Sequence, residues 1–368
     1  MLGLPQWIKG RTSRQAHVAL PEGTVEEEHG RLGFFGAASH LYRLNAPTGW
    51  TSVDGPAAHA AMDLTRLEIA DELWPTEVLR NEDLSIGYQR YTQGRPEFLR
   101  NADGDLLYFV HTGTGTLATE YGPLTFRPGD YLVVPRGTTF RFEPSEPTDL
   151  LALESRGGEI GLPDRGLLGR HALFDPALVE VPEPDPVDEQ GEFVIVVKRM
   201  GYDTRVTYPH HPCDVVGWKG DLAPMRLNVA DFRPISSARY HLPPSAHSTW
   251  VGEGFVVATF APRPGEEDPE ALKLPFYHRN IDYDEVIFYH QGDFMSRSGI
   301  AEGMLTFHGA GLHHGPQPKA VERAAKAPAG PRQIQEYAVM VDTRKPLVVT
   351  DAGQKVDLIG YAMSWSER

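Results

Sequence analysis

Three absences narrow the classes of protein to which this sequence can belong. Its 368 residues include one cysteine, Cys213, which excludes a disulfide framework within the chain and a zinc site built from thiolates. No apolar run approaches the roughly 18 residues of a membrane-spanning helix, and residues 1–15 lack the apolar core of a secretory signal. We therefore expect a protein of the reducing cytoplasm with no membrane partner.

Basic side chains are also scarce. Lysine and arginine number 35 against 50 aspartates and glutamates, which gives a formal net charge of −15 at pH 7. A protein that binds nucleic acid or anionic lipid needs a net basic surface. The sequence therefore argues against a nucleic-acid partner.

Turn-forming residues and short apolar runs are abundant. The chain has 37 glycines and 31 prolines, and 40% of its residues are hydrophobic. Between residues 85 and 145, short strand-like runs alternate with turn signals such as Thr-Gly-Thr-Gly and Arg-Pro-Gly-Asp. This spacing predicts antiparallel β-barrels. A parallel α/β fold is disfavoured because the sequence shows no long amphipathic helix.

A proline-rich acidic stretch divides the sequence. Residues 175–192 show almost no hydrophobic pattern and are typical of a linker. Strand-like runs resume at residues 193–199. We therefore predict an N-terminal domain of residues 1–190, which includes a polar N-terminal arm, and a C-terminal domain of residues 191–368.

Two segments of the chain repeat one another. Residues 99–113 (LRNADGDLLYFVHTG) and residues 278–292 (HRNIDYDEVIFYHQG) are identical at seven of fifteen positions without a gap. A weaker match follows each copy, at residues 135–140 and 309–314. Duplication of one β-barrel unit explains both matches most simply. The sequence thus predicts an all-β protein of two related antiparallel barrels with short helices.

The differences between the two copies indicate a metal site. Three positions are apolar in the first copy and could ligate a metal in the second, namely Leu99, Leu106 and Phe140 against His278, Glu285 and His314. Imidazole and carboxylate are ligands for borderline and hard metals. We therefore predict a metal in the C-terminal barrel and hydrophobic packing at the matching place in the N-terminal barrel.

Longer strings around these positions resemble a known family. The spacing from His278 to Glu285, and then to Gly311 and His314, is that of the two cupin motifs, with Asn280 in place of the usual second histidine. Further matching strings lie at residues 121–129, 212–220, 255–263, 277–280, 305–308 and 314–316. Together they resemble the homogentisate 1,2-dioxygenase family from about residue 85 to residue 320. The resemblance implies a bicupin, two jelly-roll barrels of which only the C-terminal one is catalytic.

The resemblance also implies a cofactor and a reaction. The cofactor would be Fe(II), bound by His278, Glu285 and His314, a ligand set that leaves positions open for an aromatic substrate and O₂. The family reaction opens the ring of homogentisate with O₂ and gives maleylacetoacetate, a step of tyrosine and phenylalanine catabolism. Since the family forms trimers that pair into hexamers, we expect a homo-oligomer.

Other residues take their expected roles from the same resemblance. A histidine upstream of the ligands is the expected catalytic base, and the candidates are His241, which we favour, and His247. The positions expected to contact substrate are Tyr277, Asn280, Phe294 and His308. Phe294 stands where better-known relatives have a tyrosine.

Several alternatives stay open. Asp284 is a rival ligand to Glu285, because better-known relatives have one residue fewer between the histidine and the carboxylate. The missing tyrosine hydroxyl at Phe294 leaves room for a related hydroquinone or aminophenol as substrate. A bicupin that binds a metal or small ligand without catalysis is another possibility. A sugar-phosphate isomerase is weaker, since it would need a histidine in place of Asn280.

Overall fold

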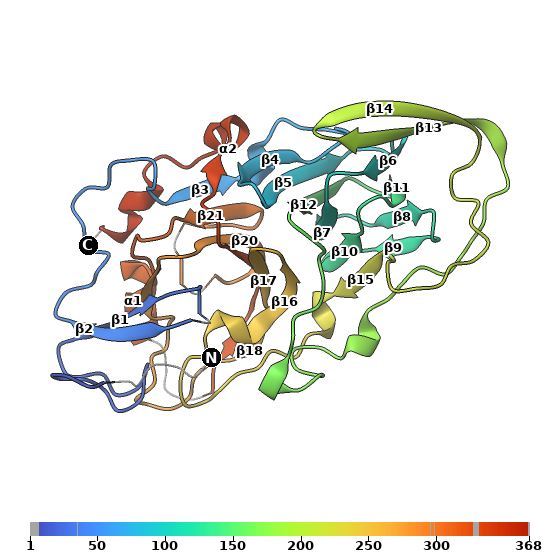
Figure 1. The fold of residues 1–368 in the computed structure, drawn as a ribbon. Coiled ribbons are helices and arrows are strands. Elements are labelled where there is room, and N and C mark those ends of the chain that lie inside the picture. The colour runs from blue at the N-terminus through green and yellow to red at the C-terminus, as the bar shows by residue number, and fades with distance from the viewer. Residues whose placement is uncertain (1–6, 35, 295, 298, 327–330, 367–368) are drawn as a thin grey trace.

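The computed structural model describes residues 7–34, 36–294, 296–297, 299–326 and 331–366. In this part of the chain, strands dominate and the α-helices are two short ones, α1 (Pro318–Ala325) and α2 (Asp351–Lys355). The ribbon forms two lobes of β-structure (Figure 1). No helix among the described residues is long and apolar enough to cross a membrane. The predicted all-β, two-barrel class is confirmed.

Two sheets form the N-terminal barrel. Their strand orders are β15-β10-β7-β12-β5-β4-β24 and β14-β13-β6-β11-β8-β9. The strands are β4 (Thr76–Arg80), β5 (Leu84–Tyr91), β6 (Phe98–Asn101), β7 (Asp105–Thr112), β8 (Gly115–Thr119), β9 (Leu124–Phe126), β10 (Asp130–Val134), β11 (Thr139–Pro144), β12 (Thr148–Ser155), β13 (Gln190–Arg199), β14 (Tyr202–His210), β15 (Met225–Asn228) and β24 (Val348–Val349).

The C-terminal barrel has one large sheet and two small ones. Their orders are β16-β17-β23-β20-β21-β3, β19-β1-β2 and β18-β22. The strands are β1 (Val25–Gly30), β2 (Ala38–Arg43), β3 (Ala60–Asp63), β16 (Ser248–Gly252), β17 (Phe255–Phe260), β18 (Arg263–Pro264), β19 (Tyr277–Asn280), β20 (Asp284–Gly292), β21 (Met304–His308), β22 (Gln333–Ile334) and β23 (Glu336–Thr343).

Strand pairing crosses the predicted division at residue 190. From the N-terminal segment, β1 pairs in parallel with β19, and β3 pairs with β21. In the other direction, β13 pairs with β6, β15 with β10, and β24 with β4. An open sheet edge leaves backbone groups unpaired, and each barrel covers some of its edges with strands from the other half of the chain. Figure 1 shows the blue arm of β1 and β2 beside the yellow and orange strands.

The repeated sequences occupy equivalent places in the two barrels. Leu99 on β6 pairs with Phe140 on β11, as His278 on β19 pairs with His314. The N-terminal members, with Leu106, are buried in one hydrophobic cluster. Burial of each apolar side chain of this kind contributes roughly 1.5–3 kcal/mol to the free energy of folding. The N-terminal barrel therefore fills with apolar side chains the place where the C-terminal barrel has potential metal ligands.

The turn that follows is also repeated. Gly137 N–H donates to the carbonyl of Asn101, and Gly311 N–H donates to that of Asn280, both at 2.8 Å. The two glycines have φ values of +87° and +84°, a region in which side chains with a Cβ are strained. The shared glycine frame of the second match thus encodes one turn used twice.

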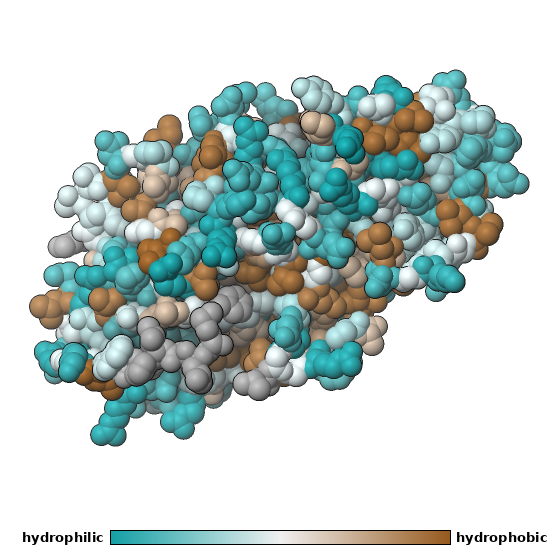
Figure 2. Space-filling view, in the orientation of Figure 1, coloured by the Kyte–Doolittle hydropathy of each residue, from teal (hydrophilic) through white to brown (hydrophobic). Residues whose placement is uncertain are grey.

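The two barrels pack on each other through a shared hydrophobic core. One cluster joins Phe109 and Tyr131 of the first barrel to Val286 and Phe288 of the second. On the face of the molecule seen in Figure 2, hydrophilic residues are interspersed with small clusters of hydrophobic residues.

A histidine pair contributed by the repeat lies in this interface. His111 and His290 occupy matching positions of β7 and β20, and their Nδ1 atoms lie 3.0 Å apart. Both side chains are buried. Burial, and then the charge of His111, lower the pKa of His290 to about 3 from its ordinary 6.5.

We expect this pair to make stability depend on pH. A lowered pKa means that the unfolded chain takes up a proton near pH 6.5 while folded His290 stays neutral, so stability is present above pH 6.5 and is lost as pH falls toward 3. From pH 7 to pH 4.5 the loss should be about 2–3 kcal/mol. Urea unfolding of the metal-free proteins measures this loss. Between pH 7 and pH 4.5, the free energy of unfolding of His290→Gln should fall by about 2–3 kcal/mol less than that of the wild type. The exposed control His171→Gln should keep the wild-type slope, and equal slopes for all three proteins would refute the expectation.

Candidate metal centre

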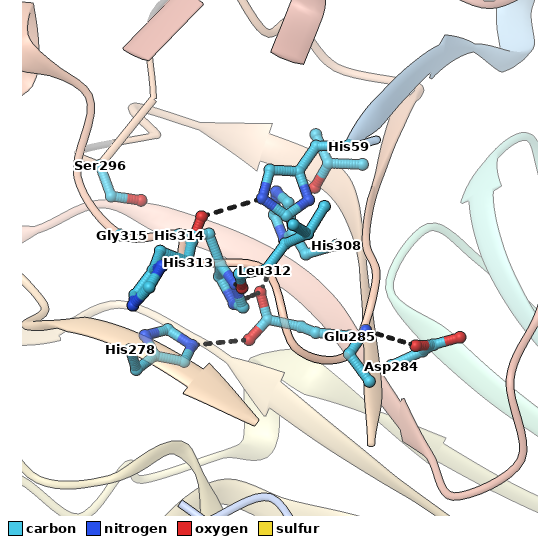
Figure 3. A network of polar contacts seen from close by, with 12 residues as sticks. His59, His278, Asp284, Glu285, Ser296, His308, Leu312, His313, His314 and Gly315 are labelled. Carbon is cyan, nitrogen blue, oxygen red and sulfur yellow. Dashed lines mark hydrogen bonds and ion pairs between the residues drawn. The ribbon is translucent and has the colours of Figure 1, made fainter. Parts of the chain in front are cut away.

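Three side chains converge inside the C-terminal barrel. His278 lies on β19, Glu285 lies on β20, and His314 follows β21 in a loop that bridges to β19. The backbones of His278 and His314 exchange two hydrogen bonds of 2.9 Å, which set the two imidazoles beside each other. In Figure 3 the rings of both histidines lie next to the Glu285 carboxylate. The structure thus brings the three predicted ligands together.

A turn explains how residues seven positions apart can meet. On one straight strand an odd offset places side chains on opposite faces. Here β19 ends at Asn280 and β20 begins at Asp284, so the chain changes direction between the ligands. His278 Nε2 lies 3.4 Å from Glu285 Oε2, and His314 Nε2 lies 3.3 Å from Oε1. The ligand atoms are all within 4.8 Å of one another.

The second nitrogen of each ring indicates how the imidazoles are protonated. Nδ1 of His278 lies 3.3 Å from the carbonyl oxygen of Phe276, and Nδ1 of His314 lies 3.4 Å from that of Leu312. Because a carbonyl only accepts, Nδ1 of each ring is the donor in these contacts, which leaves Nε2 facing Glu285. Nε2 of His314 is buried and makes no hydrogen bond to a described residue. The arrangement therefore fits a divalent metal ion.

The local charges suit such an ion. Burial alone would raise the pKa of Glu285, but His314, His278 and His308 outweigh it and hold that pKa well below its ordinary value. Asp342 lies opposite on β23, and burial followed by the charge of Glu285 raises its pKa well above the ordinary value. The two carboxyl groups are therefore shifted in opposite directions. Burial, followed by the charge of His278, lowers the pKa of His314 to about 4, which keeps this ring neutral.

Asp284, the rival ligand, has a structural role. Its Oδ1 accepts the N–H of Ala310 and its Oδ2 accepts that of Leu347, both at 2.7 Å. The matching Asp105 accepts the N–H groups of Arg136 and Ile160 in the same way. Figure 3 shows the Asp284 carboxylate on the far side of the strand from the histidines. It therefore fixes the turn and lies outside the ligand cluster.

A cavity opens beside the ligand atoms. It has a volume of about 80 Å³, and both His278 and Glu285 line it. A neighbouring cavity of about 170 Å³ shares Phe34 and His241 with it. A substituted aromatic ring needs more room than the first cavity offers, so a ligand of that size would extend toward the second.

Comparison with known proteins assigns the family. The family description of the homogentisate 1,2-dioxygenase N-terminal domain matches residues 77–229, and that of the C-terminal domain matches residues 242–367. Together the two matches cover well over half of the chain. The chain belongs to the homogentisate 1,2-dioxygenase family.

Relatives in this family differ in length and in what their names state. A Saccharolobus solfataricus protein, provisionally named a dioxygenase without a substrate, is 34% identical over 97% of this chain and 98% of its own length. Homogentisate 1,2-dioxygenase of Bradyrhizobium diazoefficiens is 30% identical over 72% of this chain, which spans 62% of that protein. A cupin barrel protein from Leptotrichia buccalis aligns at a TM-score of 0.35 and 10% identity, covering 77% of this chain and 96% of that one. At that score the family assignment rests on the sequence matches.

The two candidate bases of this dioxygenase lie in different surroundings. His241 lines the cavity with His278 and Glu285, and its Nδ1 lies 2.8 Å from Glu266 Oε1. His247 is not among the described residues that line it, and its Nε2 lies 2.9 Å from the carbonyl of Ile235. Burial lowers the pKa of His247 to about 4. The geometry favours His241 for a role at the ligand atoms.

The four residues expected at substrate are not among the described residues that line this cavity. His308 is turned to Glu285, with its Nδ1 2.8 Å from Oε1 and its Nε2 3.2 Å from the Tyr361 hydroxyl. Phe294 packs on Tyr289 and lines a separate depression. Asn280 is buried, with no hydrogen bond from its amide group to a described residue. Tyr277 is half-buried on β19, where it alternates with His278.

Several residues at the site were not among the candidates from the sequence. His59 packs edge-on against the rings of His308 and His314, and its Nε2 lies 3.0 Å from the carbonyl of His313. Tyr289 and Arg297 line the cavity. His59 stands alone in its segment, and Arg297 lies in a loop, so neither belongs to a recognisable spacing. Tyr289 could have been found, because it lies four residues after Glu285 on the same strand.

Proposed function

We propose that this chain is an Fe(II)-dependent dioxygenase that opens the ring of homogentisate with O₂ to give maleylacetoacetate, a step of tyrosine and phenylalanine catabolism. The observation that carries the proposal is the meeting of two imidazoles and one carboxylate in a buried cavity. This donor set suits ferrous iron in oxygenases. Iron held there would supply the redox chemistry that lets O₂ react with the aromatic ring. The ligands of this ion would be His278, Glu285 and His314.

The chain offers a base for the hydroxyl proton of the substrate. Since Nδ1 of His241 donates to Glu266, its Nε2 presents a lone pair. Nε2 makes no hydrogen bond to a described residue. A histidine oriented in this way by a carboxylate can take the proton of a substrate hydroxyl and hold it. His241 would thereby favour the electron-rich phenolate form of the ring.

An arginine in the cavity supports an acidic substrate. Arg263 also lines it but is neutralised by Glu336, 2.9 Å away. Arg297 has no salt bridge within the described part of the chain, and its Nη1 donates to the carbonyl of Gly315 at 2.7 Å. Its buried Nε lacks a hydrogen-bond partner there. A buried guanidinium with a free donor recognises a carboxylate, the group that distinguishes homogentisate from hydroquinone.

Oxygen uptake tests this proposal directly. Metal-free protein would be loaded anaerobically with Fe²⁺, mixed with homogentisate and then exposed to air, while O₂ and product absorbance are followed. We expect one O₂ consumed per homogentisate and a ring-opened product. Uptake only with another hydroquinone or an aminophenol would keep the reaction class and reject the substrate. No uptake with any of them would favour a bicupin that binds a metal or a small ligand without catalysis.

A related hydroquinone or an aminophenol stays as the second candidate substrate, because Phe294 supplies no hydroxyl and lies away from the cavity. Pairing a variant with two substrates separates these candidates. Arg297→Gln should raise KM for homogentisate about 10–100-fold, which corresponds to the roughly 1.5–3 kcal/mol of a charged hydrogen bond. It should change KM for hydroquinone less than about threefold, and bound iron should stay unchanged. Equal losses for both substrates would show that Arg297 does not recognise the carboxylate.

The expected homo-oligomer and cytoplasmic location belong to the same proposal. Light scattering of the purified chain would measure its mass against that of a trimer or a hexamer.

A further inference from the structure

A second group of potential metal ligands lies outside the catalytic barrel's centre, in the N-terminal segment. It consists of His17, Glu26 on β1 and His40 on β2, whose ligand atoms all lie within 4.8 Å of one another. His17 and Glu26 are buried, with 6% and 1% of their surfaces exposed. Glu26 binds His17 twice, through the backbone N–H at 2.9 Å and through Nδ1 at 2.7 Å, both to Oε2.

Two buried polar atoms of this group have no hydrogen-bond partner among the described residues. Glu26 Oε1 and His40 Nδ1 are buried and make no hydrogen bond to a described residue. They lie 3.7 Å apart, too far for a hydrogen bond. A hydrogen-bonding interaction with Tyr42 lowers the pKa of Glu26, but the partner within hydrogen-bond distance of the Tyr42 hydroxyl is Ser13 Oγ, at 2.7 Å. An unpaired buried polar atom costs about 1–3 kcal/mol, so both atoms call for a partner.

The spacing of these atoms suits a shared cation. Two ligands of one tetrahedral zinc ion, each about 2.0–2.1 Å from it, lie about 3.3 Å apart. The separation between Glu26 Oε1 and His40 Nδ1 is close to that value. The other nitrogen of His40, Nε2, lies 3.7 Å from Glu28 Oε2. A metal-binding histidine commonly turns its second nitrogen to a carboxylate in this way.

We propose that His17, Glu26 and His40 form a second metal site, which takes a divalent cation of borderline softness such as Zn²⁺. The cation would replace the proton between His17 Nδ1 and Glu26 and give both unpaired atoms a partner. The backbone N–H of His17 still holds Oε2 and fixes the carboxylate. Three protein ligands leave one position of a tetrahedral ion for water.

The position of the site suggests a structural effect on the catalytic cavity. The His17 ring stacks on Phe276, with centroids 4.1 Å apart and an interplanar angle of 8°. Phe276 lines the catalytic cavity, and its ring centroid lies 5.7 Å from that of His278. His17 also lines the neighbouring cavity with Phe34. A cation here would therefore fix the N-terminal segment against the wall of the catalytic cavity.

Metal binding is best measured in a variant that lacks two of the three catalytic ligands. In the full-length double variant Glu285→Gln/His314→Ala, stripped with chelator, Zn²⁺ titration followed by calorimetry and by metal analysis should give about one ion per chain. Adding His40→Ala should reduce this to under about 0.1. Adding His171→Ala, an exposed histidine, should leave it unchanged. Co²⁺ should give the visible absorption of a tetrahedral site in the double variant and lose it with His40→Ala.

Zn²⁺ should also raise the melting temperature of the double variant, and not that of the triple variant with His40→Ala. If His40→Ala does not fold, Glu26→Gln, which keeps the shape of the side chain, takes its place in every measurement. No Zn²⁺ bound in the double variant at 100 μM, or binding unaffected by both substitutions, would overturn the proposal. Since the double variant lacks two of the three catalytic ligands, this result is independent of the oxygenase activity.

Discussion

His314→Ala is expected to remove the metal of the C-terminal barrel without unfolding the chain. Wild-type protein reconstituted with Fe²⁺ should hold about one catalytic iron, and the variant should hold less than about a tenth of that. Removing a residue that only orients a metal ligand already lowers metal affinity or activity about 10–100-fold. Removing a ligand itself should therefore lower kcat/KM at least about 10³-fold. Iron analysis and O₂ uptake measure the two effects. Circular dichroism should match the wild type, because the backbone pairing of His314 with His278 needs no side chain.

The duplicated fold supplies a matched control for this variant. Phe140 occupies the place of His314 in the N-terminal barrel, where it is fully buried against Tyr108 and Phe142. Phe140→Ala should lower the free energy of unfolding by about 3–5 kcal/mol while iron content stays at the wild-type level. Iron loss in Phe140→Ala, or full iron content in His314→Ala, would contradict the assignment of one metal-binding and one apolar barrel.

The ligand set could be predicted because the chain contains two copies of the same turn. Side chains that build the turn are identical in both copies, as Asp105 and Asp284 are, and both accept two backbone N–H groups in the structure. Side chains that differ between the copies are therefore not required to build the turn. This comparison separated Glu285 from its neighbour Asp284 without any coordinates.

The pairing of strands across the predicted domain boundary could not be predicted in the same way. Local strand patterns show that β1 and β13 are strands, but not which sheet edge each one covers. That choice depends on contacts between residues far apart in the sequence, such as the pairing of β1 with β19. The position of Phe294 is difficult to predict for a related reason. It follows the end of β20 in a loop, where a count of residues from Glu285 no longer fixes the direction of a side chain.

His59 could not be predicted from the sequence, because a single histidine forms no spacing pattern with other potential site residues. The strand that follows it, β3, pairs with β21 and thereby brings the ring to the metal ligands. Burial, followed by the charge of His314, lowers the pKa of His59 to about 3, so the ring is neutral. It therefore adds no positive charge beside the metal centre.

The second large effect concerns the proton of the substrate. His241→Gln should lower kcat about 10²–10⁴-fold, the usual contribution of a positioned base, while iron content stays unchanged. The reason is geometric, since Glu266 binds Nδ1 at 2.8 Å and leaves Nε2 to take the proton in the cavity. Steady-state O₂ uptake gives kcat, and iron analysis of the same samples gives the metal content.

Two further variants decide whether His241 acts as the base or only packs the cavity wall. Glu266→Gln should lower kcat less than His241→Gln does, because the ring stays in place but loses the carboxylate that orients it. His247→Gln should keep kcat within about threefold, since its Nε2 is bound to the carbonyl of Ile235 and the ring packs on Phe260. Imidazole added to His241→Ala should restore part of the rate if a proton acceptor is what the variant lacks. A larger loss in His247→Gln than in His241→Gln would transfer the role of base to His247.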